Sequence, residues 1–526
     1  MTALSRSRVI TEPLGGSALS QAVQLRRLPS ELQPWWPGNA EEWQAHVSRV
    51  RAAVPRTWYD AIQPAIAPHG AAASRLSRVV EEGGVVVTTG QQAGLFGGPL
   101  YTLAKAFTAL GLADALEQQL GIATAPVFWA ATDDADFLEA SITHVADADG
   151  LHELTLTNKP LAGTPMSRAP LGDVTALLEQ LRKACGSAAH AAYFELSHVA
   201  FTQERTLGDA YVRLLRDLLE PLGVCVMDSS HPAYTKAAGP LLIEALERAP
   251  EIARASAERA AAIRKSGFEP QVEDERGLSL VAIVERGAKR RVPIDGVEKA
   301  LKGRALHTLA PNVLLRPVVE REILPTVAYV AGPAELAYFA QSSVVAVALR
   351  RTPPVGVPRW SCTVVEPFAD KALERLGVEY HELRDLAALQ RRLATAALPI
   401  SVSSAWETLQ AQVQKSVRAL GSAVQDASLM PPEVIEGLER SLVHKLTRAE
   451  RRLLAAVKRR EERVRRDLHV ASDALFPAGQ RQERVLNYIP MLTRGGPDLV
   501  EDMRTAARAH ALSLLRVEKN EPVAAG

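Results

Sequence analysis

Cysteine is scarce in this sequence, with only Cys185, Cys225 and Cys362 among 526 residues. These three residues lie far apart and lack the paired spacing of thiolate zinc sites and redox motifs, so no metal is predicted. Free cysteine is among the most buried residue types, which favours core positions over a role as nucleophile. So few thiols fit a reducing compartment, and we expect a cytoplasmic protein.

Long apolar runs and an excess of one charge are also missing. The richest apolar stretch, residues 85–131, is interrupted by Lys105, Asp114 and Glu117, so no membrane span is predicted. Residues 1–20 lack the apolar core of a signal peptide. The 61 Lys and Arg residues balance 60 Asp and Glu residues, so the whole chain has no strong field to attract nucleic acid or an acidic membrane.

The composition is that of an ordinary globular protein, with 47% hydrophobic and 23% charged residues. This is far from the low hydrophobicity and high charge of disordered chains. A chain of 526 residues also exceeds the size at which a single core stops growing, so we expect two to four structural units.

The order of strands and helices predicts an α/β core domain over residues 81–367. Nearly continuous apolar runs at 85–89 and 127–132 indicate strands covered on both faces, joined by a glycine-rich loop and a helix from Pro99. Right-handed crossovers place such strands in one sheet. We therefore expect a doubly wound parallel sheet. Its later elements are expected at 207–219 (helix), 224–227 (strand) and 326–330 (strand).

Three segments do not follow this alternation. Residues 1–80 are expected to form an irregular and helical lead-in that packs on the core. The segments at about 145–200 and 250–310 are expected to be insertions in the core domain. The second insertion contains a predicted β-hairpin, residues 278–285 and 291–294 around Gly287.

Residues 368–526 have a different sequence pattern, which predicts a helical coiled-coil domain followed by a C-terminal segment. Between Ile435 and Leu468 the apolar residues are spaced by threes, fours and sevens, with charges between them. Pro431 and Pro432 interrupt an earlier helix at about 404–427, which makes an antiparallel helical hairpin plausible. Because the seam is longer than one short partner helix can readily cover, we expect a homodimer.

The glycine-rich loop between the first strand and its helix is the sharpest motif. Four glycines within nine residues allow positive φ and close backbone approach, and the following helix N-terminus offers N–H groups to an anion. Helical periodicity places Lys105 opposite the apolar stripe, free to face a ligand. The alternative is a tightly packed turn beside a solvated lysine. The expected substrate- or nucleotide-binding residues are Thr89, Gly90, Gln91, Gln92, Gly94, Gly97, Gly98, Tyr101 and Lys105.

Three carboxylates follow the second strand, which carries Trp129. Asp133, Asp134 and Asp136 are the catalytic candidates, because ligands of open α/β sheets bind outside the carboxyl ends of the strands. The glycine-rich loop leaves the same edge, so we expect loop, Trp129 and carboxylates around one crevice. Helix capping by Asp133 or Asp134 is the alternative for one of them.

Two further strand ends carry polar residues. Asp228 and Ser229 follow the strand at 224–227, with His231 beside them as either a capping or a catalytic residue. The strand at 326–330 leads through Gly332 and a proline into a helix whose first turns carry Glu335 and Tyr338. Upstream of that strand, Arg316 could hold a carboxylate or phosphate.

Several of these motifs together resemble the bacillithiol biosynthesis cysteine-adding enzymes, a family of cysteine ligases. The resemblance rests on the loop from Thr89 to Gly94 and on the strand that carries Trp129 with its acidic tail. It extends over nearly the whole chain, and the other segments that carry it are 98–102, 324–326, 331–333, 353–354, 358–359 and 482–484.

The resemblance implies a Rossmann-like core, similar to class I aminoacyl-tRNA synthetases, with inserted connecting-peptide segments and a coiled-coil domain that pairs subunits. It also implies a ligase that adds cysteine to the amine of glucosaminyl-malate, forming an amide. Since a carboxylate is a poor electrophile, we expect ATP or another nucleotide to activate it. In this scheme the Gly90–Gly98 loop and Lys105 hold phosphate, and Asp134 or Asp136 orients the sugar or accepts its ammonium proton.

One departure from the family pattern matters, because Ala135 stands where the family commonly has a histidine. Where the family commonly has Glu-Asp-His-Asp, this chain has Asp133, Asp134, Ala135 and Asp136. The alternative from another class is therefore a family member that has lost catalysis and acts as a coiled-coil assembly or binding protein. RNA binding through the basic helix at 458–466 is a further alternative, although a solvated helix face explains that cluster better.

Overall fold

The computed structural model describes residues 6–187, 190–273, 275–285, 287–302, 308–396, 400–460 and 462–515. The side chains of residues 396 and 458–460 lie outside the description, and with them much of the basic cluster at 458–466. The chain forms two compact units. Unit 1 comprises Met1–Asp147, Leu151–Glu366 and Arg481–Gly526, and unit 2 comprises Ala148–Gly150 and Pro367–Gln480. The predicted helical domain ran to residue 526, whereas the structure groups the chain from Arg481 onward with unit 1.

A five-stranded parallel sheet forms the centre of unit 1, in the strand order β11-β10-β2-β3-β6. The parallel, doubly wound sheet predicted from the sequence is confirmed. The first strand is longer than predicted, because Gln91 and Gln92 continue it opposite Ala130 and Ala131. The strands are β2 (Val85–Gln92), β3 (Thr124–Ala131), β6 (Cys225–Asp228), β10 (Thr326–Ala331) and β11 (Gly356–Pro358).

Helices cover both faces of this sheet, as the alternation of buried side chains on β3 shows. Val127 and Trp129 enter one hydrophobic cluster, while Phe128 and Ala130 enter a second cluster on the opposite face. The first cluster includes α1 (Ala18–Gln24), α2 (Ala40–Ala53), α3 (Trp58–Ile66), α4 (Gly70–Glu82), α10 (Pro232–Glu247), α11 (Ala249–Lys265), α13 (Arg316–Ile323) and α14 (Pro333–Ala348). The second includes α7 (Thr175–Cys185), α8 (Ala192–Ala200) and α9 (Leu207–Leu219).

The long helix α5 (Tyr101–Leu120) connects β2 to β3 and contributes to both clusters. The C-terminal helix α21 (Tyr488–Leu515) packs against it. The two helices approach closely at Gly111, where an added Cβ would lie 2.9 Å from the Cα of Arg508. The N-terminal strand β1 (Arg8–Thr11) pairs antiparallel with β12 (Cys362–Val365). The described elements nearest to the two ends of the chain, β1 and α21, therefore pack within unit 1.

Both predicted insertions contain structure of their own. The first holds the antiparallel strands β4 (Ile142–Asp147) and β5 (Gly150–Thr155), followed by α7 and α8. The second holds a hairpin of β7 (Leu278–Glu285) and β8 (Ala288–Pro293), whose second strand starts three residues earlier than predicted. A third strand, β9 (Leu309–Pro311), extends this hairpin in the order β8-β7-β9. Gly287 has φ +84°, as the turn of a hairpin requires.

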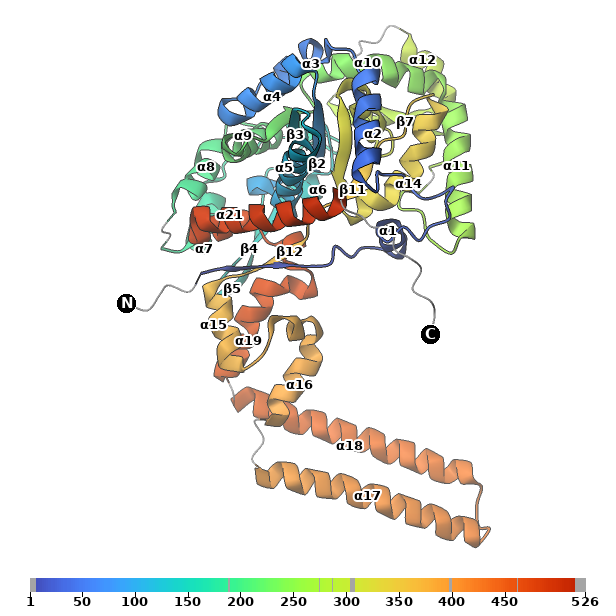
Figure 1. Cartoon of the computed structure of the whole chain (residues 1–526). Helices are drawn as coiled ribbons and strands as arrows, with labels where there is room; N and C mark the ends of the chain where they lie inside the picture. The colour runs from blue at the N-terminus through green and yellow to red at the C-terminus, as the bar shows by residue number, and fades with distance from the viewer. Residues whose placement is uncertain are drawn as a thin grey trace. The chain divides into compact units, whose positions relative to one another are not determined.

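Unit 2 is helical and contains the predicted antiparallel hairpin. Its two longest helices, α17 (Ile400–Asp426) and α18 (Pro432–Arg460), run side by side (Figure 1). They approach closely at Gly421, whose added Cβ would lie 3.3 Å from Ile435. The remaining helices are α15 (Pro367–Leu376), α16 (Leu386–Ala396) and α19 (Glu462–Leu475).

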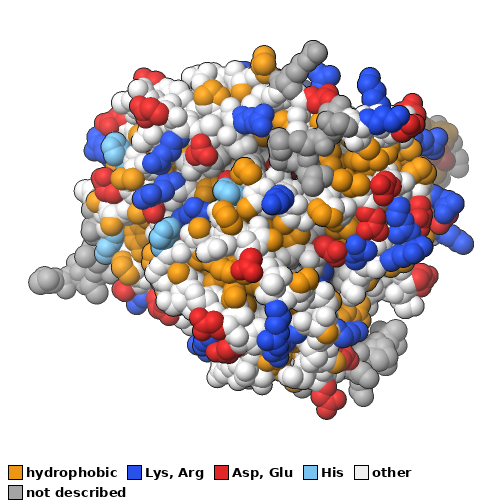
Figure 2. All heavy atoms as spheres, turned by 90° about the horizontal axis from the view of Figure 1, so that it is seen from above, with side chains coloured by type: hydrophobic (Ala, Val, Ile, Leu, Met, Phe, Trp, Pro, Cys, Tyr) orange, Lys and Arg blue, Asp and Glu red, His pale blue; other side chains and the backbone are white. Residues whose placement is uncertain are grey.

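Three general expectations can be compared with this fold. The three cysteines are buried and free, and burial raises the pKa of the Cys225 thiol to about 12. Among the described residues, no helix combines the length and apolar character that crossing a membrane requires. Figure 2 shows acidic and basic side chains interspersed over one face of the molecule, in line with the balanced charge of the sequence.

Candidate active site

A pocket of about 320 Å³ opens at the carboxyl ends of β2 and β3. Five predicted site residues line it: Gln92, Asp133, Asp134, Asp136 and Arg316. The parallel sheet brings Gln92 and the acidic segment together, because β2 and β3 end side by side. The other lining residues are Ala135, Ala282, Lys289, Arg291, Pro311, Asn312 and Val313.

Asp133 is held in place by two partners. Lys289 on β8 approaches its carboxylate at 2.7 Å, and the Ser229 hydroxyl donates to it at 2.7 Å. Burial alone would raise the pKa of Asp133, but the ion pair with Lys289 and the Ser229 hydrogen bond outweigh burial and hold that pKa below its usual range. Asp133 is therefore an ionised and engaged carboxylate, which makes it a poor candidate for proton transfer.

Asp134 has no cation within ion-pair distance among the described residues. Its carboxylate accepts hydrogen bonds from the Gln92 side-chain amide at 2.8 Å and from the Asp136 backbone N–H at 2.9 Å. Asp136 accepts a bond from the Glu139 backbone N–H at 3.2 Å and caps the short helix α6 (Phe137–Ala140). Capping was considered for Asp133 or Asp134, but Asp136 has this role. Asp134 is thus the best placed of the three carboxylates for chemistry.

Residues at and after the end of β6 form hydrogen bonds with the residues that follow β3. The Thr132 hydroxyl donates to Asp228, which also accepts the Ser230 backbone N–H at 2.9 Å. Ser229 contacts Asp133, as described above. His231 accepts the Ala233 backbone N–H through Nδ1 at 3.1 Å and caps α10. Of the two roles left open for His231, the structure shows capping.

Thr89, Gly90 and Trp129 lie inside the sheet rather than at the pocket. The Thr89 hydroxyl is fully buried and donates to the Val330 carbonyl at 2.8 Å. An alanine Cβ at Gly90 would lie 2.9 Å from the Trp129 carbonyl oxygen. The Trp129 ring is 1% exposed and packs edge-on against Tyr234, with ring centroids 5.0 Å apart. The expectation that Trp129 borders the crevice is wrong.

The glycines of the loop at 94–98 pack against the C-terminal segment. An added Cβ at Gly97 would lie 1.9 Å from the Tyr488 hydroxyl, and Gly94 lies against Gly98. The Asn487 side-chain amide donates to the Phe96 carbonyl at 3.0 Å. At the start of α5, the Leu100 backbone N–H already donates to the Leu486 carbonyl at 2.9 Å. These contacts fit the tightly packed turn better than a phosphate cradle.

Lys105 is buried, at 4% exposed, so the expectation of a lysine that faces the crevice is wrong. Its ammonium pairs with Glu335 at 2.6 Å and donates to the Gly90 carbonyl at 2.7 Å and to the Gln91 side-chain oxygen at 3.1 Å. Periodicity placed Lys105 opposite the apolar stripe of α5, but Glu335 of α14 and two residues of β2 contact its ammonium there. Gln91 in turn donates to the Tyr101 hydroxyl at 3.1 Å.

Glu335 connects this cluster to α14. Its carboxylate accepts the Gly332 backbone N–H at 2.6 Å and the Tyr329 hydroxyl at 2.7 Å, which confirms its place in the first helical turn. Burial would raise the pKa of Glu335, but Lys105 and these hydrogen bonds hold it below its usual range. On the same helix, the Tyr338 hydroxyl accepts a hydrogen bond from Arg316 at 3.4 Å.

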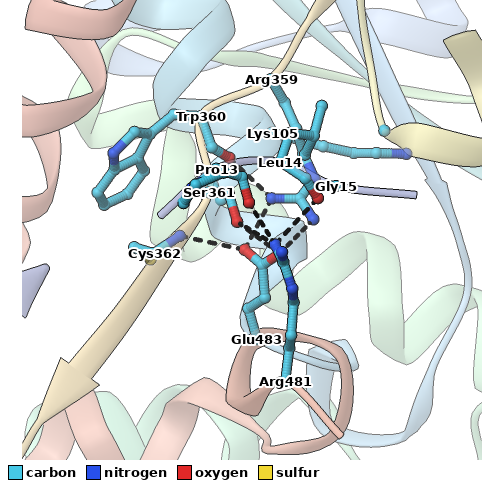
Figure 3. Close-up of polar contacts among 12 residues, drawn as sticks. Pro13, Leu14, Gly15, Lys105, Arg359, Trp360, Ser361, Cys362, Arg481 and Glu483 are labelled. Carbon is cyan, nitrogen blue, oxygen red and sulfur yellow. Dashed lines mark hydrogen bonds and ion pairs between the residues drawn. The ribbon is translucent and has the colours of Figure 1, made fainter. Parts of the chain in front are cut away.

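A second buried ion pair lies beside Lys105. Glu483 on α20 (Gln482–Val485) points at Arg359 and forms two hydrogen bonds of 2.8 Å with its guanidinium (Figure 3). Both side chains are 2% exposed. Arg481 reaches the carbonyls of Pro13 and Leu14, so the N-terminal and C-terminal segments meet here (Figure 3). This ion pair and the contacts of Leu486 and Asn487 hold the C-terminal segment against the glycine-rich loop.

Comparisons with known proteins agree with this architecture. Residues 37–298 and 298–360 match the family model described as Bacillithiol biosynthesis BshC, N-terminal Rossmann-like domain. Residues 362–514 match Bacillithiol biosynthesis BshC, C-terminal coiled-coil domain. The chain belongs to the BshC family.

Relatives in this family are similar over most of their length. "Putative cysteine ligase BshC" of Solibacter usitatus (strain Ellin6076) is 31% identical over 81% of this chain and 82% of its own length. The protein of the same name from Koribacter versatilis (strain Ellin345) is 30% identical over 83% and 85%. That from Heliobacterium modesticaldum (strain ATCC 51547 / Ice1) is 30% identical over 83% of both chains.

Every residue that lines the pocket falls within the part of this BshC family member that matches the Rossmann-like model. Lys289, Arg291 and Asn312 were not predicted as site residues. Lys289 and Arg291 are two residues apart on β8 and so share one face, but the strand predicted from the sequence began only at Arg291 and left Lys289 in the turn. What the sequence did not show is that the inserted hairpin folds over the end of β3.

The described residues contain no group of three or more His, Cys, Asp or Glu side chains arranged to hold a metal ion. The acidic segment does not form such a group, because Asp133 is paired with Lys289 and Asp136 caps a helix. The polar side chains that line this pocket offer carboxylate, amide, ammonium and guanidinium groups.

Proposed function

We propose that this BshC family member is a ligase that joins the carboxyl group of cysteine to the amine of glucosaminyl-malate. The relatives named "Putative cysteine ligase BshC" and the bacillithiol biosynthesis family models support a reaction of this class. The new bond is an amide: the amine nitrogen attacks the cysteine carbonyl carbon, a C–N bond forms, an activated C–O bond breaks, and the ammonium proton leaves.

The observation that carries this proposal is the position of Asp134. Its carboxylate faces the pocket, is oriented by Gln92 at 2.8 Å, and has no described cation within ion-pair distance. Such a group can orient an ammonium and take up its proton, which is worth about 10²- to 10⁴-fold in rate. Asp133 and Ser229 keep the acidic segment in place.

ATP or another nucleotide is the co-reactant we propose for activating the carboxylate. The residues first expected to hold its phosphates do not fit that role, because Leu486 and Tyr488 cover the loop at 94–98 and Lys105 is paired with Glu335. The proposed nucleotide therefore does not bind through that loop. Buried free thiols also fit the cytoplasmic, reducing location that we propose.

The experiment that tests the function uses the full chain with L-cysteine, glucosaminyl-malate and ATP. Mass spectrometry should detect the amide, and chromatography should detect a nucleotide product in equal amount. If neither product forms, the assembly-protein alternative becomes the better explanation. The apolar side chains exposed on α17 and α18, among them Leu409 and Leu420, are the observation that favours that alternative.

A further inference from the structure

The charged side chains of the pocket differ in how they are paired. Lys289 is engaged by Asp133 at 2.7 Å. Arg291 donates to the Ser279 carbonyl at 2.6 Å and lies 3.5 Å from Glu275. Arg316, the first residue of α13, has no carboxylate within ion-pair distance in the described part of the chain. Its only side-chain hydrogen bond there goes to the Tyr338 hydroxyl, at 3.4 Å.

The acid that could neutralise Arg316 is protonated at neutral pH. Glu320 lies one turn further along α13, is 2% exposed and receives hydrogen bonds from the hydroxyls of Thr88 and Thr326. Burial raises the pKa of Glu320 to about 8. At pH 7 this carboxyl group is therefore largely neutral, and the charge of Arg316 is not balanced by its own helix.

The other titratable groups around Arg316 do not balance it either. Glu335 on α14 is paired with Lys105, and Asp133 is paired with Lys289. Burial raises the pKa of the three tyrosines that face this cluster, so they are neutral at pH 7; they are Tyr234 on α10, Tyr329 on β10 and Tyr338 on α14. One positive charge thus remains at the wall of the pocket.

We propose that Arg316 is the carboxylate anchor of this pocket and determines which substrate group lies opposite Asp134. A guanidinium presents parallel N–H donors that match a carboxylate, and a partly buried cation without a carboxylate partner favours an anionic ligand. Asn312 uses its side-chain oxygen to cap Leu314 and Leu315, which leaves its amide N–H groups for the same ligand. The inference rests on the proposed function, and it places a malyl carboxylate of glucosaminyl-malate against Arg316.

The test measures binding of L-malate to the full chain by isothermal titration calorimetry at pH 7 and constant ionic strength. Arg316→Gln should raise the Kd for malate about tenfold or more, whereas Arg316→Lys should raise it less because the charge is kept. Arg290→Gln is the matched control, since Arg290 is exposed on the opposite face of β8. Its Kd should equal that of the unchanged chain.

A second measurement uses pH, because malate and arginine keep their charges between pH 7 and pH 9. Glu320 loses its proton as the pH rises through about 8 and then neutralises Arg316, so the affinity for malate should fall. Glu320→Gln should abolish this fall and bind malate equally well at both pH values. A merely structural role of Arg316 would not produce a pH dependence that Glu320 controls.

Titrations with different anions show which ligand Arg316 binds. Arg316-dependent binding of L-cysteine instead of malate would support the anchor and assign it to the cysteine carboxylate. The anchor is overturned if inorganic phosphate alone binds, if no carboxylate binds, or if Arg316→Gln leaves both the malate Kd and the KM for glucosaminyl-malate unchanged. Arg316-dependent malate binding without any amide product would contradict the proposed function and leave the anchor standing.

Discussion

Asp133 and Asp134 are adjacent in the sequence, but their carboxylates have different surroundings. Asp133 is bonded from both sides, by Lys289 on the inserted hairpin and by Ser229 after β6. Asp134 accepts hydrogen bonds only from neutral groups in the described residues, the Gln92 side-chain amide and the Asp136 backbone N–H, and it lines the pocket. A paired carboxylate stabilises the fold, whereas an unpaired one at a pocket wall is available for an ammonium ligand. The two residues should therefore respond differently to the same substitution.

Asp134→Asn should leave the stability nearly unchanged and lower amide formation by about 10²-fold or more, because a neutral amide cannot accept the ammonium proton. Asp133→Asn is the matched control. It leaves the largely buried Lys289 without its partner and should cost about 3 kcal/mol of unfolding free energy. A rate assay and urea unfolding of both variants check this. The opposite pattern, with Asp134→Asn unstable and Asp133→Asn stable but inactive, would reverse the two roles.

Lys105→Met should destabilise the protein by roughly 3 to 5 kcal/mol, because it leaves the Glu335 carboxylate buried without a cation. The double variant Lys105→Met, Glu335→Gln removes both charges and should recover part of that loss. Thermal unfolding of the single and double variants measures the coupling. A single variant as stable as the unchanged chain, but with weaker ATP binding, would restore the phosphate-binding role first expected of Lys105.

At the scale of elements, sequence patterns predicted what local periodicity controls. The strands at 85–89, 224–227 and 326–330 and the helix at 207–219 are present, because near-continuous apolar runs and helical spacing are local signals. Their neighbours in space were not predictable in the same way. The burial of Lys105 depends on α14, and the packing of Gly97 depends on Tyr488, hundreds of residues later in the chain. The sequence of a glycine-rich loop alone does not show whether a ligand or another segment of the chain packs against it.

The cover over this loop can be tested at Gly97. Gly97→Ala should destabilise unit 1 strongly, because the added Cβ would lie 1.9 Å from the Tyr488 hydroxyl and the backbone φ is +90°. Gly98→Ala is the control: its φ of +77° is also unfavourable, but its nearest atom is 3.6 Å away. Differential scanning calorimetry should show the larger loss for Gly97→Ala. Equal losses would mean that backbone strain alone, and not the C-terminal segment, explains the glycine.

At the scale of the whole molecule, the coiled-coil seam is only partly covered within one chain. Pairing of α17 with α18 covers part of the apolar surface, because only 6 to 8% of the surface of Val417, Val424 and Leu454 is exposed. Other apolar side chains on the same helices stay open, at 45% for Leu409, 46% for Leu420 and 47% for Val443. Exposed apolar side chains repeated along a helical hairpin favour a partner.

We therefore predict that the full chain is a homodimer through α17 and α18, and light scattering at micromolar concentration should give twice the mass of the chain. Because α21 packs along α5, a truncation near residue 370 would also remove part of unit 1, so substitutions are the better test. The double variant Leu420→Glu, Leu438→Glu should shift the mass to that of a monomer, because the dimer interface would then bury unpaired carboxylates. Gln414→Glu adds charge at an exposed polar position of α17 and should remain dimeric. A full-length chain that is monomeric at this concentration contradicts the prediction, and the exposed apolar side chains would then need another partner.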